Sequence, residues 1–303
     1  MRVLVTGAGG FVGRRLLPKL AAAGHDAVGI DREVDVADPA ALEGAVEAAA
    51  PDALVHLAAL SFVPDSFRDP EAAFRVNFLG LQNLLEAVRA RAPRARVLVV
   101  STGNVYGTAS DGAPPFAEDA PLRPESPYAR TKAAADLLAR SYAERGLEVV
   151  RARPFNHTGR GRPEAFVESS LARQLVEIAA GRRAPRLVVG NLDAVRDFLD
   201  VEDVVAAYLR LLDPAVPAGL YNVASGVGRS IREVLAALLD LADPGGLRGA
   251  LEIEVDPGRW RPTDRAVGDA ARLRAAAGWE PRILFESSLR ALLDGWRAEL
   301  NVA

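Results

Sequence analysis

A glycine-rich turn near the start of the chain constrains its fold more strongly than any other feature. A short β-branched run at 2–6 comes first, and an amphipathic helical pattern follows the turn. Gly7 would permit the tight turn, Gly10 would let a pyrophosphate approach the backbone, and Gly13 would let the helix pack on the strand. The phosphates would then lie at the positive N-terminus of this helix. The predicted dinucleotide-binding loop comprises Gly7, Gly10, Phe11, Val12 and Gly13.

Short strand-like runs alternate with longer helical patterns through the first half of the chain. The strand candidates are 2–6, 26–30, 53–57, 96–101 and 147–152. Apolar residues at three- and four-residue spacing fill the intervening segments 11–23, 39–50, 71–91 and 127–145. This alternation is typical of repeated βαβ units. It predicts an α/β fold with a doubly wound parallel sheet of the Rossmann type.

The regular alternation ends beyond residue 153, where Pro and Gly become frequent. Segments 185–200 and 225–285 look irregular and polar, whereas 203–212 has a helical pattern and 219–224 that of a strand. The chain is therefore expected to return to the first domain before it ends in a second. The predicted parts are a dinucleotide-binding domain of 1–153 plus about 201–224, and a smaller C-terminal α/β substrate-binding lobe of 154–200 and 225–303.

Composition matters mainly for the partners that it excludes. The 303 residues are 50% hydrophobic, which is ample for a core. A net charge of -3 gives no footprint for nucleic acid, and no apolar run is long enough for a membrane span. The first residues enter a strand directly, so we expect no export segment and a cytoplasmic location. The chain has no cysteine, and His25, His56 and His157 lack metal-cluster spacing, so no metal site is expected.

Residues at the ends of the second and third strands extend the predicted cofactor site. Asp31 could accept hydrogen bonds from the adenosine ribose hydroxyls, which favours NAD. Arg32 could instead pair with a 2′-phosphate, so NADP stays open. Asp35 and Val36 stand where adenine could bind, although a solvated turn aspartate is an alternative. The end of the third strand completes this predicted site with Leu57, Ala58 and Ala59.

Tyr128 and Lys132 stand four residues apart within a predicted helix. That spacing places a phenol and an ammonium on one helix face. The ordinary pKa of tyrosine is about 10, and a fixed cation nearby would lower it and make the phenol a usable acid or base. An isolated pair of this kind is usually a surface pair. Whether Tyr128 and Lys132 act in catalysis therefore depends on whether the glycine-rich loop binds a cofactor.

Together these motifs resemble the extended short-chain dehydrogenase/reductase family. The motifs are the three glycines of the loop, Asp31, the run 56–59, Thr102 after a strand, and Tyr128 with Lys132. The runs 153–159, 190–198 and 221–226 resemble the nucleotide-sugar branch, and the whole chain is most similar to GDP-4-keto-6-deoxy-D-mannose reductases, also called GDP-D-rhamnose synthases. The resemblance implies NAD or NADP as cofactor, a nucleotide-diphosphate sugar as substrate, and a homodimer formed through helices 71–91 and 127–145.

The resemblance also implies a role for individual residues. Tyr128 corresponds to the proton donor, Lys132 to the residue that binds the nicotinamide ribose and lowers the tyrosine pKa, and Thr102 to the hydroxyl that orients the sugar carbonyl. Phe155 would lie beside the nicotinamide. The implied substrate-binding residues are Ser61, Thr102, Asn104, Asn156, Arg196, Arg261 and Asp264. The two arginines would hold the diphosphate, since a guanidinium matches phosphate oxygens. Apart from the resemblance, Arg160 and Arg162 could either line the substrate mouth or be solvated loop residues, and we expect the solvated loop.

The two residues after Thr102 distinguish between possible reactions. Related dehydratases carry one or two acids there, because elimination of water needs a base at C5 and an acid at the leaving hydroxyl. Here Gly103 and Asn104 cannot exchange a proton. The prediction is NAD(P)H-dependent reduction of the C4 ketone of a nucleotide-linked 4-keto-6-deoxyhexose. A 4-epimerase with tightly bound NAD is the main alternative, ahead of a 4,6-dehydratase or a non-catalytic NAD(P)-binding sensor.

Overall fold

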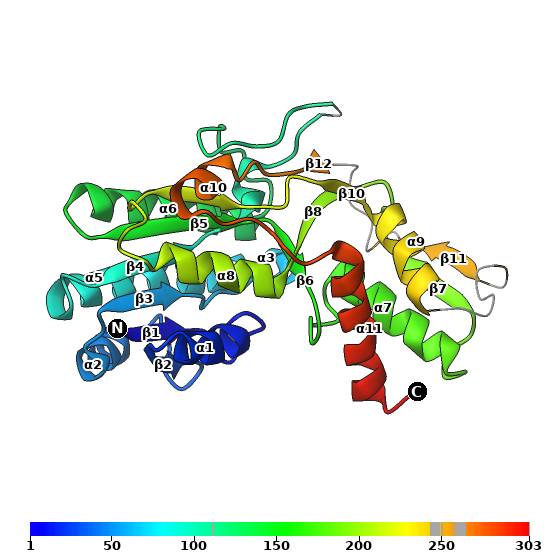
Figure 1. Cartoon of the computed structure of the whole chain (residues 1–303), viewed down its shortest axis with the longest axis horizontal. Helices are drawn as coiled ribbons and strands as arrows, with labels where there is room; N and C mark the ends of the chain where they lie inside the picture. The colour runs from blue at the N-terminus through cyan, green and yellow to red at the C-terminus, as the bar shows by residue number, and fades with distance from the viewer. Residues whose placement is uncertain (111, 243–248, 250, 257, 259–264, 303) are drawn as a thin grey trace.

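The computed structural model describes residues 1–110, 112–242, 249, 251–256, 258 and 265–302 (Figure 1). Within these residues the main sheet has six strands in the order β2-β1-β3-β4-β5-β9, and each neighbouring pair is parallel. The strands are β1 (Arg2–Thr6), β2 (Asp26–Ile30), β3 (Ala53–His56), β4 (Arg96–Val100), β5 (Val149–Pro154) and β9 (Leu220–Val223). The expected doubly wound parallel sheet is therefore confirmed.

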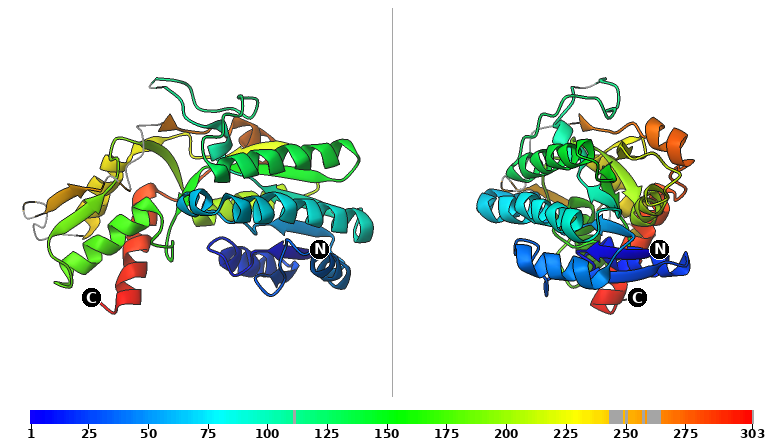
Figure 2. Two further views of the ribbon diagram at one scale, coloured as in Figure 1. Left: turned by 180° about the vertical axis from the view of Figure 1, so that it is seen from behind. Right: turned by 90° about the vertical axis from the view of Figure 1, so that its left-hand side faces the viewer.

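Helices cover both faces of this sheet (Figure 2). One layer contains α2 (Pro39–Ala49), α5 (Gly80–Arg91) and α6 (Pro127–Glu144), and the other contains α1 (Gly13–Ala22), α8 (Val201–Leu211) and α10 (Ala271–Ala277). Successive strand residues point to opposite faces, so Leu4 packs under the first layer while Val3 and Val5 pack under the second. Burial on both faces explains why the strands are almost continuously apolar.

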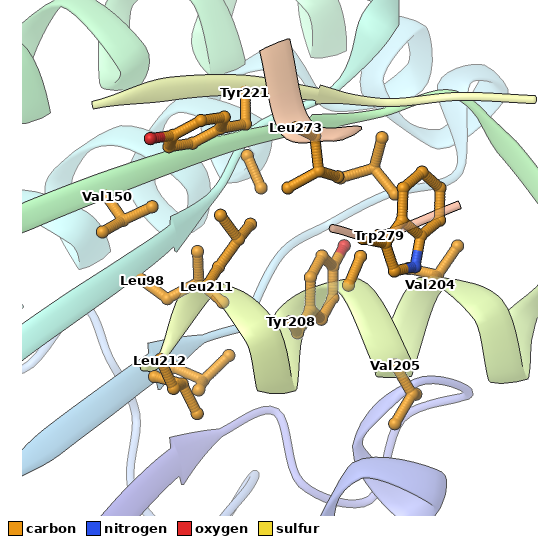
Figure 3. Packing of buried hydrophobic residues seen from close by; sticks show 14 of the residues in the cluster. Leu98, Val150, Val204, Val205, Tyr208, Leu211, Leu212, Tyr221, Leu273 and Trp279 are labelled. Atoms are coloured by element: carbon orange, nitrogen blue, oxygen red, sulfur yellow. The ribbon is translucent and has the colours of Figure 1, made fainter. Parts of the chain in front are cut away.

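The second layer is closed by α8, as Figure 3 shows. Its residues Tyr208 and Leu211 belong to the same buried cluster as Leu98 and Val150 of the sheet. Trp279, from the segment after α10, packs on this cluster, and its indole N–H donates to the backbone oxygen of Asp203 at 3.0 Å. Residues close to the C-terminus thus help to bury the main sheet.

The helix expected at 71–91 contains a π-helical turn. The helix α3 (Val63–Arg68) comes first, and α4 (Pro70–Phe74) leads through the π turn η1 (Arg75–Leu79) into α5. Asn77 of this turn is buried and bonds to the backbone N–H and C=O of Leu60 at 2.8 and 3.1 Å. Its amide also donates to the Thr131 hydroxyl of α6 at 3.1 Å. The turn therefore ties the loop after β3 to the helix that carries Tyr128.

The second half of the chain is more regular than the sequence indicates, so the expectation of irregular structure at 185–200 and 225–285 is wrong. The elements there are β6 (Asn156–Thr158), β7 (Arg186–Val189), β8 (Val195–Asp200), β10 (Gly228–Ser230), α9 (Ile231–Ala242), β11 (Glu252–Val255) and β12 (Arg265–Ala266). These strands are short and pair with distant segments, as β7 does with β11. Such pairing leaves little local pattern to recognise.

A second hydrophobic cluster lies outside the main sheet. It joins α9 to α7 (Val167–Ala179) and α11 (Phe285–Leu300), with Leu175, Leu238 and Leu292 among its fully buried members. The boundaries of the two predicted domains stay a proposal. None of the helices within the described residues combines the length and the apolar character that a membrane span requires.

Candidate active site

A cleft of about 1900 Å³ runs along the carboxyl ends of the main-sheet strands. Its lining extends from the turn between β1 and α1, across the ends of β3, β4 and β5, to α7 and β7. Open α/β sheets bind their ligands at this edge. Pockets for drug-sized ligands usually measure about 300–1,000 Å³. The cleft is therefore large enough for a dinucleotide and a second ligand together.

The cleft brings together the predicted site residues that the structure describes. They are Gly7, Gly10, Phe11, Val12, Gly13, Asp31, Arg32, Asp35, Val36, Leu57, Ala58, Ala59, Ser61, Thr102, Asn104, Tyr128, Lys132, Phe155, Asn156 and Arg196. The predicted residues Arg261 and Asp264 lie outside the described residues. Arg196 can thus be placed at the cleft, while the second arginine of the expected diphosphate pair cannot.

The glycine loop has the close packing that a dinucleotide site needs. Gly7 has a φ of +69°, and a Cβ there would lie 2.7 Å from the backbone nitrogen of Ala58. A Cβ on Gly13 would lie 2.5 Å from the carbonyl oxygens of Gly7 and Ala8. No side chain caps the N-terminus of α1, so an anion can approach the positive end of the helix dipole there. The loop therefore fits a dinucleotide diphosphate.

The acidic residues after β2 differ in their surroundings. The Asp31 carboxylate lies over the loop, because a Cβ on Gly9 would come within 2.1 Å of its Oδ2. Asp35 is engaged elsewhere, since its carboxylate accepts from Arg75 Nη1 at 3.0 Å and from the Ala37 N–H at 2.9 Å. Asp31 is thus the better placed of the two to bind a ribose.

Local structure fixes the start of α6 and with it Tyr128. The Ser126 hydroxyl caps the helix by accepting the Ala129 N–H at 3.1 Å. Ser66 of α3 accepts the Tyr128 N–H at 3.0 Å. Thr102 caps the 3₁₀ turn η2 (Gly103–Tyr106), because its hydroxyl accepts the Asn104 N–H at 3.2 Å, and the same hydroxyl opposes the rise in the pKa of Tyr128. The hydroxyls of Thr102 and Tyr128, which are expected to bind the carbonyl oxygen of the sugar, therefore both lie in the cleft.

The electrostatics of Tyr128 differ from what its spacing to Lys132 suggests. Burial raises the pKa of Tyr128 above its ordinary value, and the opposing effects come from the Thr102 hydroxyl and the Arg162 guanidinium. Lys132 instead donates from Nζ to the backbone oxygen of Val100. Burial lowers the pKa of Lys132 to about 8, opposed by the Asp136 carboxylate. The role of Lys132 in lowering the tyrosine pKa stays a prediction.

His56, at the end of β3, is a packed histidine. It is 1% exposed, and its Nδ1 lies 2.8 Å from the Thr6 hydroxyl. Burial, aided by the charge of Lys132, lowers the pKa of His56 to about 3. The imidazole is therefore neutral at physiological pH.

The Phe155 ring occupies a socket between two glycines. A Cβ on Gly103 would lie 3.0 Å from three ring carbons, and a Cβ on Gly268 would lie 2.3 Å from another. The socket holds the chain just before Asn156, which opens β6 at the cleft. It also means that no side chain fits at position 103 unless Phe155 moves.

Arg162 lies in the cleft, so its expected place in a solvated loop is wrong. Its Nε donates to the Glu168 carboxylate at 3.2 Å, and its guanidinium carbon lies 3.4 Å from the centre of the Phe166 ring. The guanidinium is also 5.1 Å from the centre of the Phe11 ring in the glycine loop. Sequence could not show this, because Glu168 belongs to α7, for which no helix is predicted.

The fold and this site together define a dinucleotide-dependent oxidoreductase of the short-chain dehydrogenase/reductase class. A family model described as GDP-mannose 4,6 dehydratase matches residues 32–292, and the chain belongs to this family. The resemblance inferred from the motifs is therefore confirmed.

Individual relatives span nearly the full chain. The GDP-6-deoxy-D-mannose reductase of Pseudomonas aeruginosa is 41% identical over 99% of this chain and 98% of its own. The UDP-glucose 4-epimerase of Mycolicibacterium smegmatis is 31% identical over 98% and 99%. Among solved structures, RMD from Pseudomonas aeruginosa complexed with NADPH superposes with a TM-score of 0.87 at 40% identity, covering 99% of this chain and 98% of that one.

Proposed function

We propose that this chain reduces the C4 ketone of a nucleotide-linked 4-keto-6-deoxyhexose, of the GDP-4-keto-6-deoxy-D-mannose type, with NADH or NADPH. The observation that carries the proposal is the placement of Thr102 and Tyr128 in one cleft, with Gly103 and Asn104, which cannot exchange a proton, directly after Thr102. The similarity to the reductase of Pseudomonas aeruginosa supports it.

The side chains in the cleft have complementary tasks in this reaction. The bound coenzyme supplies the hydride. The Thr102 hydroxyl would hydrogen-bond the C4 oxygen and hold the carbonyl in place. The buried phenol of Tyr128 would give its proton to the same oxygen as negative charge develops there. Lys132 would hold the coenzyme ribose, and the buried position of these groups keeps water away from the reacting carbon.

Two features argue against dehydration. An acid at position 103 would clash with the Phe155 ring, because a Cβ there already lies 3.0 Å from it. Asn104 lines the cleft but carries an amide. Elimination of water needs an acid and a base at the sugar, and neither position supplies one.

A 4-epimerase is the second candidate, because the chain is also 31% identical to a UDP-glucose 4-epimerase. Oxidation and re-reduction at C4 would use the same residues.

A panel of GDP-, dTDP-, UDP- and CDP-linked 4-keto-6-deoxy sugars, each assayed with NADH and NADPH, tests the reductase. We expect coenzyme oxidation with the GDP-linked ketone. Absence of oxidation throughout the panel, with interconversion of the C4 epimers when the corresponding nucleotide-linked 4-hydroxy sugars are supplied, would establish the epimerase instead.

We also propose a homodimer. Phe74 and Leu137 are 44% and 53% exposed on α4 and α6, and Leu79 of the π turn is 37% exposed. Apolar side chains of this size on neighbouring helices suit contact with a second copy. Light scattering during size exclusion tests this, and a monomer at high concentration would refute it.

A cytoplasmic location stays a prediction from the sequence.

A further inference from the structure

The lining of the cleft carries a surplus of positive charge. Among the described residues it includes seven Arg or Lys side chains against four Asp or Glu, in a chain whose net charge is -3. Some of these cations are solvated, since the side chains of Arg68 and Arg75 are 74% and 52% exposed. The Arg162 side chain is only 10% exposed. A cation that is buried at a cleft needs nearby negative charge to offset its loss of water.

Local contacts hold the Arg162 guanidinium in a fixed position. Its Nε donates to the Glu168 carboxylate at 3.2 Å, and that carboxylate is 2% exposed. The guanidinium carbon lies 3.4 Å from the centre of the Phe166 ring. The Ser169 hydroxyl donates to the backbone oxygen of Arg162 at 2.6 Å and anchors this loop to α7. Because the arginine is already ordered, a ligand that bound it would lose little affinity to side-chain ordering.

The far end of the guanidinium remains open to a ligand. An arginine side chain has five N–H donors, and the one on Nε is used by Glu168. Within the part of the chain that the structure describes, Nη1 and Nη2 of Arg162 have no hydrogen-bond acceptor. Neither nitrogen is among the side-chain atoms there that are both buried and unpaired, so a molecule in the cleft can reach them.

Direct contacts place this guanidinium beside the glycine loop. The ring centre of Phe11, in that loop, lies 5.1 Å from the guanidinium carbon of Arg162. Arg15 of α1 covers the Phe11 ring at 4.4 Å and donates to the Phe11 backbone oxygen at 2.7 Å. Arg15 also donates to the backbone oxygen of Arg160, in the same loop as Arg162. The open end of Arg162 thus lies close to the loop that fits a diphosphate.

We propose that Arg162 is a ligand-binding residue, whose Nη1 and Nη2 bind the oxygens of a diphosphate in the cleft. A planar guanidinium pairs with two phosphate oxygens at once and keeps its charge when it is buried. Arg162 would act in addition to the expected arginines 196 and 261. The inference rests on the proposed function, because the coenzyme and the nucleotide sugar both carry a diphosphate. The chemistry of the contact is the same for either, so the experiment separates the two.

The partner carboxylate gives the proposal a second, opposite prediction. Glu168 offsets part of the positive charge of Arg162 in a place where water screens it little. Removal of the carboxylate, with the guanidinium retained, should leave diphosphate binding unchanged or make it stronger. If the pair served only to hold the loop, loss of either partner would weaken binding alike.

Isothermal titration calorimetry with two diphosphates tests the proposal. ADP-ribose carries the diphosphate of the coenzyme and GDP that of the proposed nucleotide sugar, and dTDP, UDP or CDP replaces GDP if GDP does not bind. Arg162→Gln should weaken the binding of at least one of the two about tenfold to hundredfold, the usual effect of hydrogen bonds to a charged group. Glu168→Gln should bind both at least as tightly as the parent protein. The matched control is Arg160→Gln, an exposed arginine of the same loop, which should leave both affinities unchanged.

The two ligands identify the source of the diphosphate. Weaker binding of ADP-ribose alone assigns Arg162 to the coenzyme, weaker binding of the nucleoside diphosphate alone assigns it to the sugar nucleotide, and weaker binding of both places it between them. Unchanged affinity for both in Arg162→Gln, or an equal loss in Glu168→Gln, would overturn the inference. If Arg162→Gln does not fold because Glu168 is left unpaired, the double variant with Glu168→Gln replaces it and should show the same loss. The titrations need no turnover, so inactivity on every keto-sugar would refute the proposed function and leave the role of Arg162 to be judged separately.

Discussion

Tyr128 must be uncharged before it can donate a proton, and its surroundings favour that form. Burial raises the pKa of its phenol, while the Thr102 hydroxyl and Arg162 limit the rise. The sequence motif correctly points to residues that share the cleft, but it cannot show the burial of Tyr128 or the place of Arg162 in the cleft. Both depend on tertiary packing, and the second depends on a helix that the sequence pattern does not predict.

Replacing Tyr128 with Phe should lower kcat by about 10²–10⁴-fold, the usual contribution of a positioned proton donor. The ring would still fill its place, so coenzyme affinity should stay close to that of the parent protein. Steady-state turnover and coenzyme fluorescence titration measure the two quantities. Unchanged kcat would show that the proton comes from another group.

Asp31 should control the choice between coenzymes. Its carboxylate lies over the glycine loop, where it can bind a ribose hydroxyl and repel a 2′-phosphate. We expect the parent protein to prefer NADH, and Asp31→Ala to shift the ratio of kcat/KM values toward NADPH. The two coenzymes are compared at fixed keto-sugar concentration. A ratio that Asp31→Ala leaves unchanged would mean that Arg32 or other groups select the coenzyme.

At the scale of elements, the strands and helices of the first half follow local sequence patterns closely. β1 and β2 have the predicted bounds, and α6 begins at the predicted residue because Ser126 and Pro127 form a typical helix start. The π turn η1 could not be expected, since it depends on the buried bonds of Asn77 to Leu60 and Thr131. π turns often occur at functional sites.

Asn77→Ala tests the importance of that turn. The change leaves the Leu60 N–H and C=O without their side-chain partner, and an unpaired buried polar group costs about 1–3 kcal/mol. We expect the free energy of unfolding in urea to fall by that amount and the KM for coenzyme to rise. Asn83→Ala, which removes one bond to the Val36 carbonyl, serves as the matched control and should destabilise less. Equal effects of the two changes would contradict this role.

At the scale of the whole molecule, two histidines with lowered pKa values couple stability to pH. Burial lowers the pKa values of His56 and His157 to about 3. The unfolded chain takes up these protons below a pH of about 6.5, whereas the folded chain does so only near pH 3. Stability should therefore be lost as pH falls from 6.5 toward 3.

Thermal unfolding between pH 4 and pH 8 checks this expectation. Tm should be nearly constant above pH 7 and should fall steadily below pH 6. His56→Asn should show a shallower acid loss, because one of the two buried imidazoles is gone. An equally steep loss in that variant would assign the acid sensitivity to other groups.

Transfer of deuterium to the sugar tests the reductase assignment most directly. GDP-4-keto-6-deoxy-D-mannose is incubated with NADH or NADPH that carries deuterium at the transferred position, and the product is analysed by mass spectrometry and NMR. We expect one deuterium at C4 for each coenzyme oxidised. A reduced product without deuterium, or no oxidation of the coenzyme in the presence of the ketone, would contradict the proposed ketone reduction.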